Sequence, residues 1–96
     1  MAENEIVVEN NERAQRYETV VDGHRAVIEY RREGERITYL HTEVPKALEG
    51  RGIGSALARA ALDDARAHNL TVVPICPIVR EYIRRHSEYE SLVQPA

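Results

Sequence analysis

The stretch "EGRGIGSAL" (Glu49–Leu57) combines two patterns that decide the middle of the fold. Glycine stands at every second position, at Gly50, Gly52 and Gly54, and an apolar pattern of helical spacing begins directly afterwards. Glycines this close together are unfavourable in a helix or a strand, so they predict a loop. A helix that follows the loop directly adds free amide groups and the positive end of its dipole. Together the two patterns predict a binding site for an anion, most often a phosphate.

After the loop, the sequence predicts helix, strand and helix. Apolar residues recur at helical spacing as far as Ala65, and Asn69, which tolerates a left-handed conformation, predicts the helix end. Three polar residues of this helix are expected on its solvent side: Asp63, Asp64 and Arg66. The run "LTVVPIC" (Leu70–Cys76) predicts a strand parallel to its neighbour, because a helix precedes it. A second short helix is expected in "IVREYIRRH" (Ile78–His86).

Before the loop, the sequence predicts antiparallel strands. The first is expected at Ile6–Glu9. Two more apolar runs, Arg16–Val21 and His24–Tyr30, flank Asp22-Gly23, a strong signal for a hairpin turn. The run "RITYLHTEV" (Arg36–Val44) follows another turn. Strict alternation along it places four side chains on one face: Ile37, Tyr39, His41 and Glu43.

The order of these elements predicts one α+β domain over residues 1–96, with two helices packed on a mixed, mostly antiparallel sheet. The composition, 43% hydrophobic and 30% charged, is ordinary for a soluble globular domain. A formal charge of −3 argues against a general nucleic-acid binder. No apolar run approaches the length of a membrane span. The single cysteine, Cys76, excludes an internal disulfide and leads us to expect a cytoplasmic protein. Histidine spacing predicts no metal site.

Three glycine motifs compete for the loop. The P-loop requires a lysine after its last glycine, and none follows any glycine here. The dinucleotide-binding motif requires a third glycine where Leu57 stands, and several parallel strands. The third motif is the pyrophosphate loop of acyl-CoA-dependent N-acetyltransferases, in which strand, loop and helix follow in this order.

The run "HTEVPKALEGRGIGSAL" (His41–Leu57) resembles the cofactor-binding motif of the GNAT superfamily of N-acetyltransferases. With "CP" and "HSEY" further on, the chain resembles the minimal, YjdJ-like branch from Ile6 to Val93. We expect the chain to lack the N-terminal helices that build the acceptor site in larger relatives. Two departures stand out: Glu49 replaces the usual Gln or Arg, and Ser87 replaces a proline.

The resemblance implies that acetyl-CoA is the cofactor and assigns residues to it. The backbone of the glycine loop would hold the pyrophosphate, and the Arg51 side chain would add charge; the loop residues are Gly50, Arg51, Gly52, Ile53, Gly54 and Ser55. Val44 would offer backbone groups to the pantetheine arm, because Pro45 has no amide hydrogen. Tyr82 would be a general acid for the leaving thiolate, or would only pack its helix onto the sheet.

Two catalytic routes stay open. In one, Cys76 takes the acetyl group with His41 as its base, and the resemblance favours this route slightly. In the other, a small-molecule or protein amine attacks acetyl-CoA directly, and His41 or Glu43 removes a proton. A lone cysteine is more often a buried packing residue. The alternative function is a CoA-binding module without turnover, and either protein would be a monomer or a weak homodimer.

Overall fold

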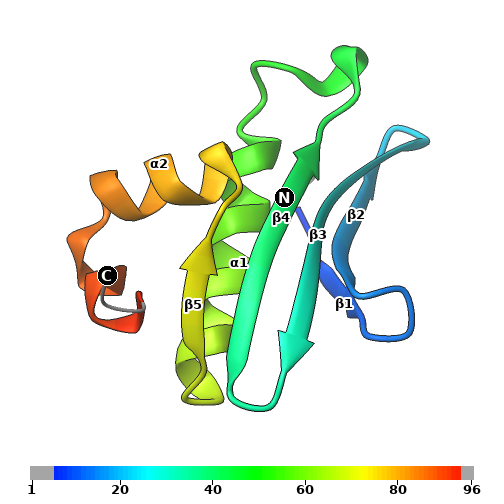
Figure 1. Ribbon diagram of the computed structural model, residues 1–96. Coiled ribbons are helices and arrows are strands. Elements are labelled where there is room, and N and C mark those ends of the chain that lie inside the picture. Colours follow the sequence, from blue (N-terminus) through cyan, green and yellow to red (C-terminus); the bar gives the residue numbers. More distant parts are fainter. Residues whose placement is uncertain (1–5, 94–96) are drawn as a thin grey trace.

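The computed structural model describes residues 6–93 and shows a five-stranded sheet with its helices packed on one face (Figure 1). In chain order its elements are β1 (Glu9–Asn11), β2 (Arg16–Val21), β3 (His24–Glu33), β4 (Arg36–Glu43), the 3-10 turn η1 (Lys46–Leu48), α1 (Ile53–Ala67), β5 (Thr71–Pro74), α2 (Pro77–Arg85) and the 3-10 turn η2 (Ser87–Leu92). This arrangement confirms the predicted α+β fold.

The strands lie in the sheet in their sequence order, from β1 to β5. The first four pair antiparallel, and β5 pairs parallel to β4, with α1 forming the connection between them. The prediction of a strand at Ile6–Glu9 was wrong in position, because pairing with β2 begins only at Glu9. The predicted hairpin turn at Asp22-Gly23 is confirmed, and both residues have the positive φ angles, 51° and 79°, that a type I′ turn requires.

Both helices contribute to one hydrophobic core on the same face of the sheet. The buried side of α1 consists of small and branched residues at helical spacing: Ile53, Leu57, Ala58, Ala61, Leu62 and Ala65. It packs against the buried side chains of the strands, including Ile28, Tyr39 and Val72. As predicted, Asn69 follows the helix with a left-handed φ of 57°. In the described residues, no helix is long and apolar enough to cross a membrane.

Two neighbouring aspartates of α1, Asp63 and Asp64, have tyrosine partners that the sequence analysis did not predict. The hydroxyl of Tyr17 on β2 donates to Asp64 at 2.5 Å, and the hydroxyl of Tyr89 in η2 donates to Asp63 at 2.5 Å. Both side chains remain partly exposed, at 42% for Asp63 and 31% for Asp64. These hydrogen bonds connect the C-terminal half of α1 to the sheet and to η2.

A β-bulge in β4 changes which side chains face the helices. The pairing with β3 shifts at this point, so that His41 lies opposite Glu29 while Tyr39 lies opposite Tyr30. Leu40 is the extra residue. The prediction that Ile37, Tyr39, His41 and Glu43 share one face was therefore wrong, because the added residue reverses the alternation.

Beyond the bulge, Thr42 shares the helix-side face, as its contact with Cys76 shows, whereas His41 and Glu43 lie on the other side. We call that other side the open face. Nine charged or titratable side chains of β2, β3 and β4 lie on it: Arg16, Glu18, Arg25, Glu29, Arg31, Glu33, Arg36, His41 and Glu43.

Candidate functional site

The two parallel strands part in the middle of the sheet. β5 pairs with β4 only from Arg36 to Tyr39, although β4 continues to Glu43. The last backbone hydrogen bond between the two segments runs from the amide of Cys76 to the carbonyl of Tyr39, at 2.8 Å. Beyond it, α2 turns away from the sheet (Figure 1). The end of β4 therefore has a free edge on its β5 side.

The glycine loop follows this free edge and carries a run of unbonded amides. The first amide in α1 with a backbone acceptor is that of Ala56, which donates to Gly52 at 3.0 Å. Within the described residues, no amide from Gly50 to Ser55 donates to a protein group. Gly50 and Gly52 have φ angles of 80° and 75°, in the left-handed region that glycine adopts without strain. These amides suit an anion at the start of the helix.

A cavity of about 440 Å³ lies between the loop and α2. We call it the loop cavity, and it is lined by Val44, Leu48, Glu49, Gly50, Gly52, Ile53, Gly54, Ser55, Pro77, Ile78, Glu81, Tyr82 and Arg85. A Cβ atom on Gly54 would lie 3.6 Å from Ile78 Cγ2 and 3.9 Å from Val44 Cγ2. The bare backbone of Gly54 thus keeps space open between the two sides of the cavity.

The loop cavity brings together all of the predicted cofactor residues except Arg51. The Arg51 guanidinium pairs instead with Asp22 of the β2–β3 turn at 2.9 Å. The three arginines of α2 also differ in the groups that they bond. Arg80 donates to the carbonyl of Ile75, whereas Arg84 and Arg85 both bond Glu81, and of the three only Arg85 lines the cavity.

Tyr82 lies in the wall of the loop cavity. Its ring stacks on His86 with centroids 3.9 Å apart. Burial raises the pKa of the Tyr82 hydroxyl above its ordinary value. This hydroxyl bonds no group in residues 6–93, so it is available to a ligand. Leu48, Ile78 and Glu81 also line the cavity and were missed by the sequence analysis, since nothing in their spacing distinguishes them from packing residues.

Cys76 lies directly before α2 but is fully buried, with an exposed fraction of 0%. Its sulfur is 2.8 Å from the hydroxyl oxygen of Thr42, a contact that the sequence analysis did not anticipate. Cys76 lines neither the loop cavity nor any other cavity described here. The thiol therefore occupies a packing position in the core.

His41 and Glu43 lie together on the open face. Nε2 of His41 is 3.3 Å from Oε2 of Glu43, and the two side chains are 54% and 70% exposed. The β-bulge places them across the sheet from the helices, whereas Cys76 lies on the helix side. The structure thus brings His41 and Glu43 together but separates both from the cysteine. Among residues 6–93, no three His, Cys, Asp or Glu side chains gather closely enough to hold a metal ion.

Comparison with known proteins identifies similar chains. Residues 16–92 match the family model described as GCN5-related N-acetyl-transferase. Protein NATD1 of Homo sapiens is 37% identical over 95 residues, which cover 94% of this chain and 84% of that protein. Protein NATD1 of Gallus gallus is 36% identical, with coverage of 94% and 86%.

Among solved structures, the solution structure of a "GCN5-like putative N-acetyltransferase" from Staphylococcus aureus matches with a TM-score of 0.69. The match covers 100% of this chain and 93% of that one, at 24% sequence identity. At this identity the likeness concerns the fold.

Proposed function

Because the chain belongs to the GCN5-related N-acetyltransferase family, we propose that it transfers the acetyl group of acetyl-CoA to an amine. One observation carries this proposal: the loop cavity opens where β4 and β5 part, and the unbonded amides from Gly50 to Ser55 border it. A pyrophosphate needs such a cluster of donors at a helix start, and a thioester needs an opening in the sheet to reach its acceptor.

The parts of the coenzyme have natural positions in this geometry. The pyrophosphate lies against the loop amides of Arg51 to Ser55. The pantetheine arm, which carries two amides, follows the free edge of β4 and bonds the backbone of Val44, as an added strand would. Glu49 lines the loop cavity, and its negative charge opposes that of the coenzyme.

The chemistry we propose is direct attack by the acceptor amine. The nitrogen forms a bond to the acetyl carbon, the C–S bond breaks, and coenzyme A leaves as a thiol. The acceptor ammonium gives up two protons in all: one reaches the thiolate and the other goes to solvent through a base. Tyr82, whose hydroxyl bonds no group in residues 6–93, gives its proton to the leaving thiolate and takes up one proton of the amine in return.

A base is needed because an alkyl ammonium with a pKa near 10.4 is less than about 0.1% neutral at pH 7. We assign this role to His41, which pairs with Glu43 on the open face. The route through an acetyl-cysteine fits the geometry less well, since Cys76 is fully buried and His41 lies on the other face. We therefore favour direct transfer.

The test is release of coenzyme A thiol from acetyl-CoA in the presence of amine acceptors, with calorimetry of CoA binding alongside. We expect CoA to bind and thiol release to depend on the acceptor. Tyr82→Phe should lower kcat more than it changes CoA affinity. Binding without turnover by any acceptor would support the non-catalytic CoA-binding module instead, and absence of CoA binding would refute both.

The cysteine route has its own test. The protein is incubated with acetyl-CoA and no acceptor, and its intact mass is measured. Direct transfer predicts no added acetyl mass, and turnover that survives Cys76→Ala. A hydroxylamine-labile acetyl adduct that disappears in Cys76→Ala, together with loss of turnover, would establish the cysteine route.

A further inference from the structure

A second cavity, of about 410 Å³, lies beside the end of β4. We call it the β4 cavity, and it is lined by Arg25, Thr42, Glu43, Val44 and Pro45. It shares Val44 with the loop cavity, and Thr42 is in contact with the sulfur of Cys76 at the point where the strands part. Small-molecule sites typically measure about 300–1,000 Å³. The β4 cavity is thus large enough for a ligand and adjoins the proposed path of the thioester.

The β4 cavity is lined by one cationic and one anionic side chain, Arg25 and Glu43, that do not pair with each other within residues 6–93. Their strands pair so that Val27 lies opposite Glu43, which makes Arg25 a diagonal neighbour of Glu43 on the open face. Diagonal neighbours lie about 7–8 Å apart. A small ligand with two opposite charges can contact both side chains at once.

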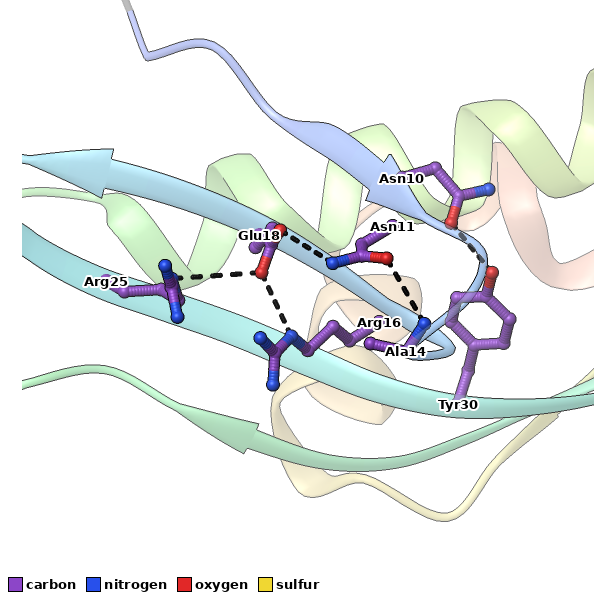
Figure 2. A network of polar contacts seen from close by, with 7 residues as sticks. All are labelled: Asn10, Asn11, Ala14, Arg16, Glu18, Arg25 and Tyr30. Carbon is purple, nitrogen blue, oxygen red and sulfur yellow. Dashed lines mark hydrogen bonds and ion pairs between the residues drawn. The ribbon is translucent and has the colours of Figure 1, made fainter.

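The guanidinium of Arg25 is only weakly engaged within the protein. Its nearest carboxylate is Glu18, at 3.8 Å, and the arginine side chain is 58% exposed. Glu18 already accepts hydrogen bonds from Arg16 at 2.9 Å and Asn11 at 3.1 Å (Figure 2). Asn11 and then Arg16 lower the pKa of Glu18 below its ordinary value, with Arg25 the smallest contributor. Arg25 can therefore turn to a ligand without leaving Glu18 unpaired.

We propose that the β4 cavity is the acceptor site and that the acceptor is a free amino acid, with its carboxylate on Arg25 and its amine beside Glu43. This inference rests on the proposed acetyltransferase function and specifies its substrate class. The amine lies next to the pair of His41 and Glu43, which can remove its proton before attack. A lysine side chain of a protein has no carboxylate at that distance and would leave Arg25 unused.

The experiment compares acceptors that differ only in the carboxylate. The proteinogenic amino acids and β-alanine are each tested beside their own carboxamides, with N-acetyl products detected by mass spectrometry. We expect the acids that react to exceed their carboxamides at least tenfold in kcat/KM. Arg25→Gln should abolish that preference. Arg31→Gln, which removes another exposed arginine of β3 on the open face, should keep it.

A binding measurement makes the outcome independent of turnover. Amide chemical shifts of the CoA-bound protein are followed by NMR as the same amino acids are added, and shifts are expected at Arg25, Thr42 and Glu43. Any of three results would overturn the acceptor assignment. They are equal kcat/KM for acids and carboxamides, reaction with peptide lysines alone, and no chemical shift change at these residues. In those cases release of coenzyme A with any amine acceptor would still support the proposed function, whereas loss of CoA binding would refute the function itself.

Discussion

A carboxylate placed in the glycine loop should weaken CoA binding by a predictable amount, and Gly52→Asp makes this change. Gly52 lies at the start of α1 with a φ of 75°, and nothing lies within 4 Å of the position that its Cβ would take. The substitution therefore adds strain of about 1–2 kcal/mol at most, without a steric clash. The folded protein should survive with a negative charge beside the unbonded amides.

The size of the effect follows from Coulomb's law. Two unit charges about 5 Å apart repel by about 0.8 kcal/mol in water. A pyrophosphate carries two charges, so the penalty is about 1.7 kcal/mol, and affinity should fall about tenfold to twentyfold. The loss should shrink as salt is added, because salt screens exposed charges.

Gly34→Asp is the matched control. Gly34 has a φ of 61° and open space at its Cβ position, but it lies in the β3–β4 turn at the opposite end of β4 from the loop (Figure 1). Both variants thus gain the same charge and similar strain. Calorimetric titration with CoA should show the loss in Gly52→Asp alone. Equal affinities in the two folded variants would refute the assignment of the loop to the pyrophosphate.

Three further predictions concern stability. Acetyl-CoA at about 100 times its dissociation constant should add roughly 2.7 kcal/mol to the free energy of unfolding, and an unchanged melting curve would exclude the coenzyme. Tyr17→Phe removes the hydrogen bond to Asp64 and should cost about 1.5–3 kcal/mol in denaturant unfolding, whereas Tyr82→Phe, whose hydroxyl bonds no group in the described part of the chain, should cost little. Burial and the hydrogen bond to Asp63 raise the pKa of Tyr89 to about 12. The contribution of Tyr89 to the free energy of unfolding is therefore complete below pH 10 and is lost as the pH rises from 10 to 12. Thermal melts across that range should show the decline, and a flat profile would contradict it.

The parts of the fold that depend on local signals could be predicted from the sequence. Asp22-Gly23 predicts its hairpin because both positions of the turn need a positive φ. The glycines at Gly50–Gly54 and the apolar stripe that follows predict the loop and helix α1 in the middle of the chain. Most of the predicted cofactor residues could be placed at one cavity for the same reason, since they are consecutive in sequence.

The features that depend on tertiary pairing could not be predicted. No residue type marks Leu40 as the extra residue of a bulge, so the alternation rule assigned His41 to the wrong face. The helical pattern predicts Asp63 and Asp64 on the solvent side of α1. It could not predict their tyrosine partners, because these lie 26 and 47 positions away in the chain. The β4 cavity likewise combines Arg25 with residues that only the antiparallel pairing brings near it.

The bulge at Leu40 gives β4 one residue more than its pairing with β3 uses. Deleting this one codon would remove the bulge, and His41 would follow Tyr39 directly while still lying opposite Glu29. His41 and Glu43 would stay on the open face, and Thr42 would stay on the side of Cys76. In a strand without a bulge, the loss of one residue exchanges the faces of everything that follows, but here the extra residue can absorb a single deletion and leave the site intact.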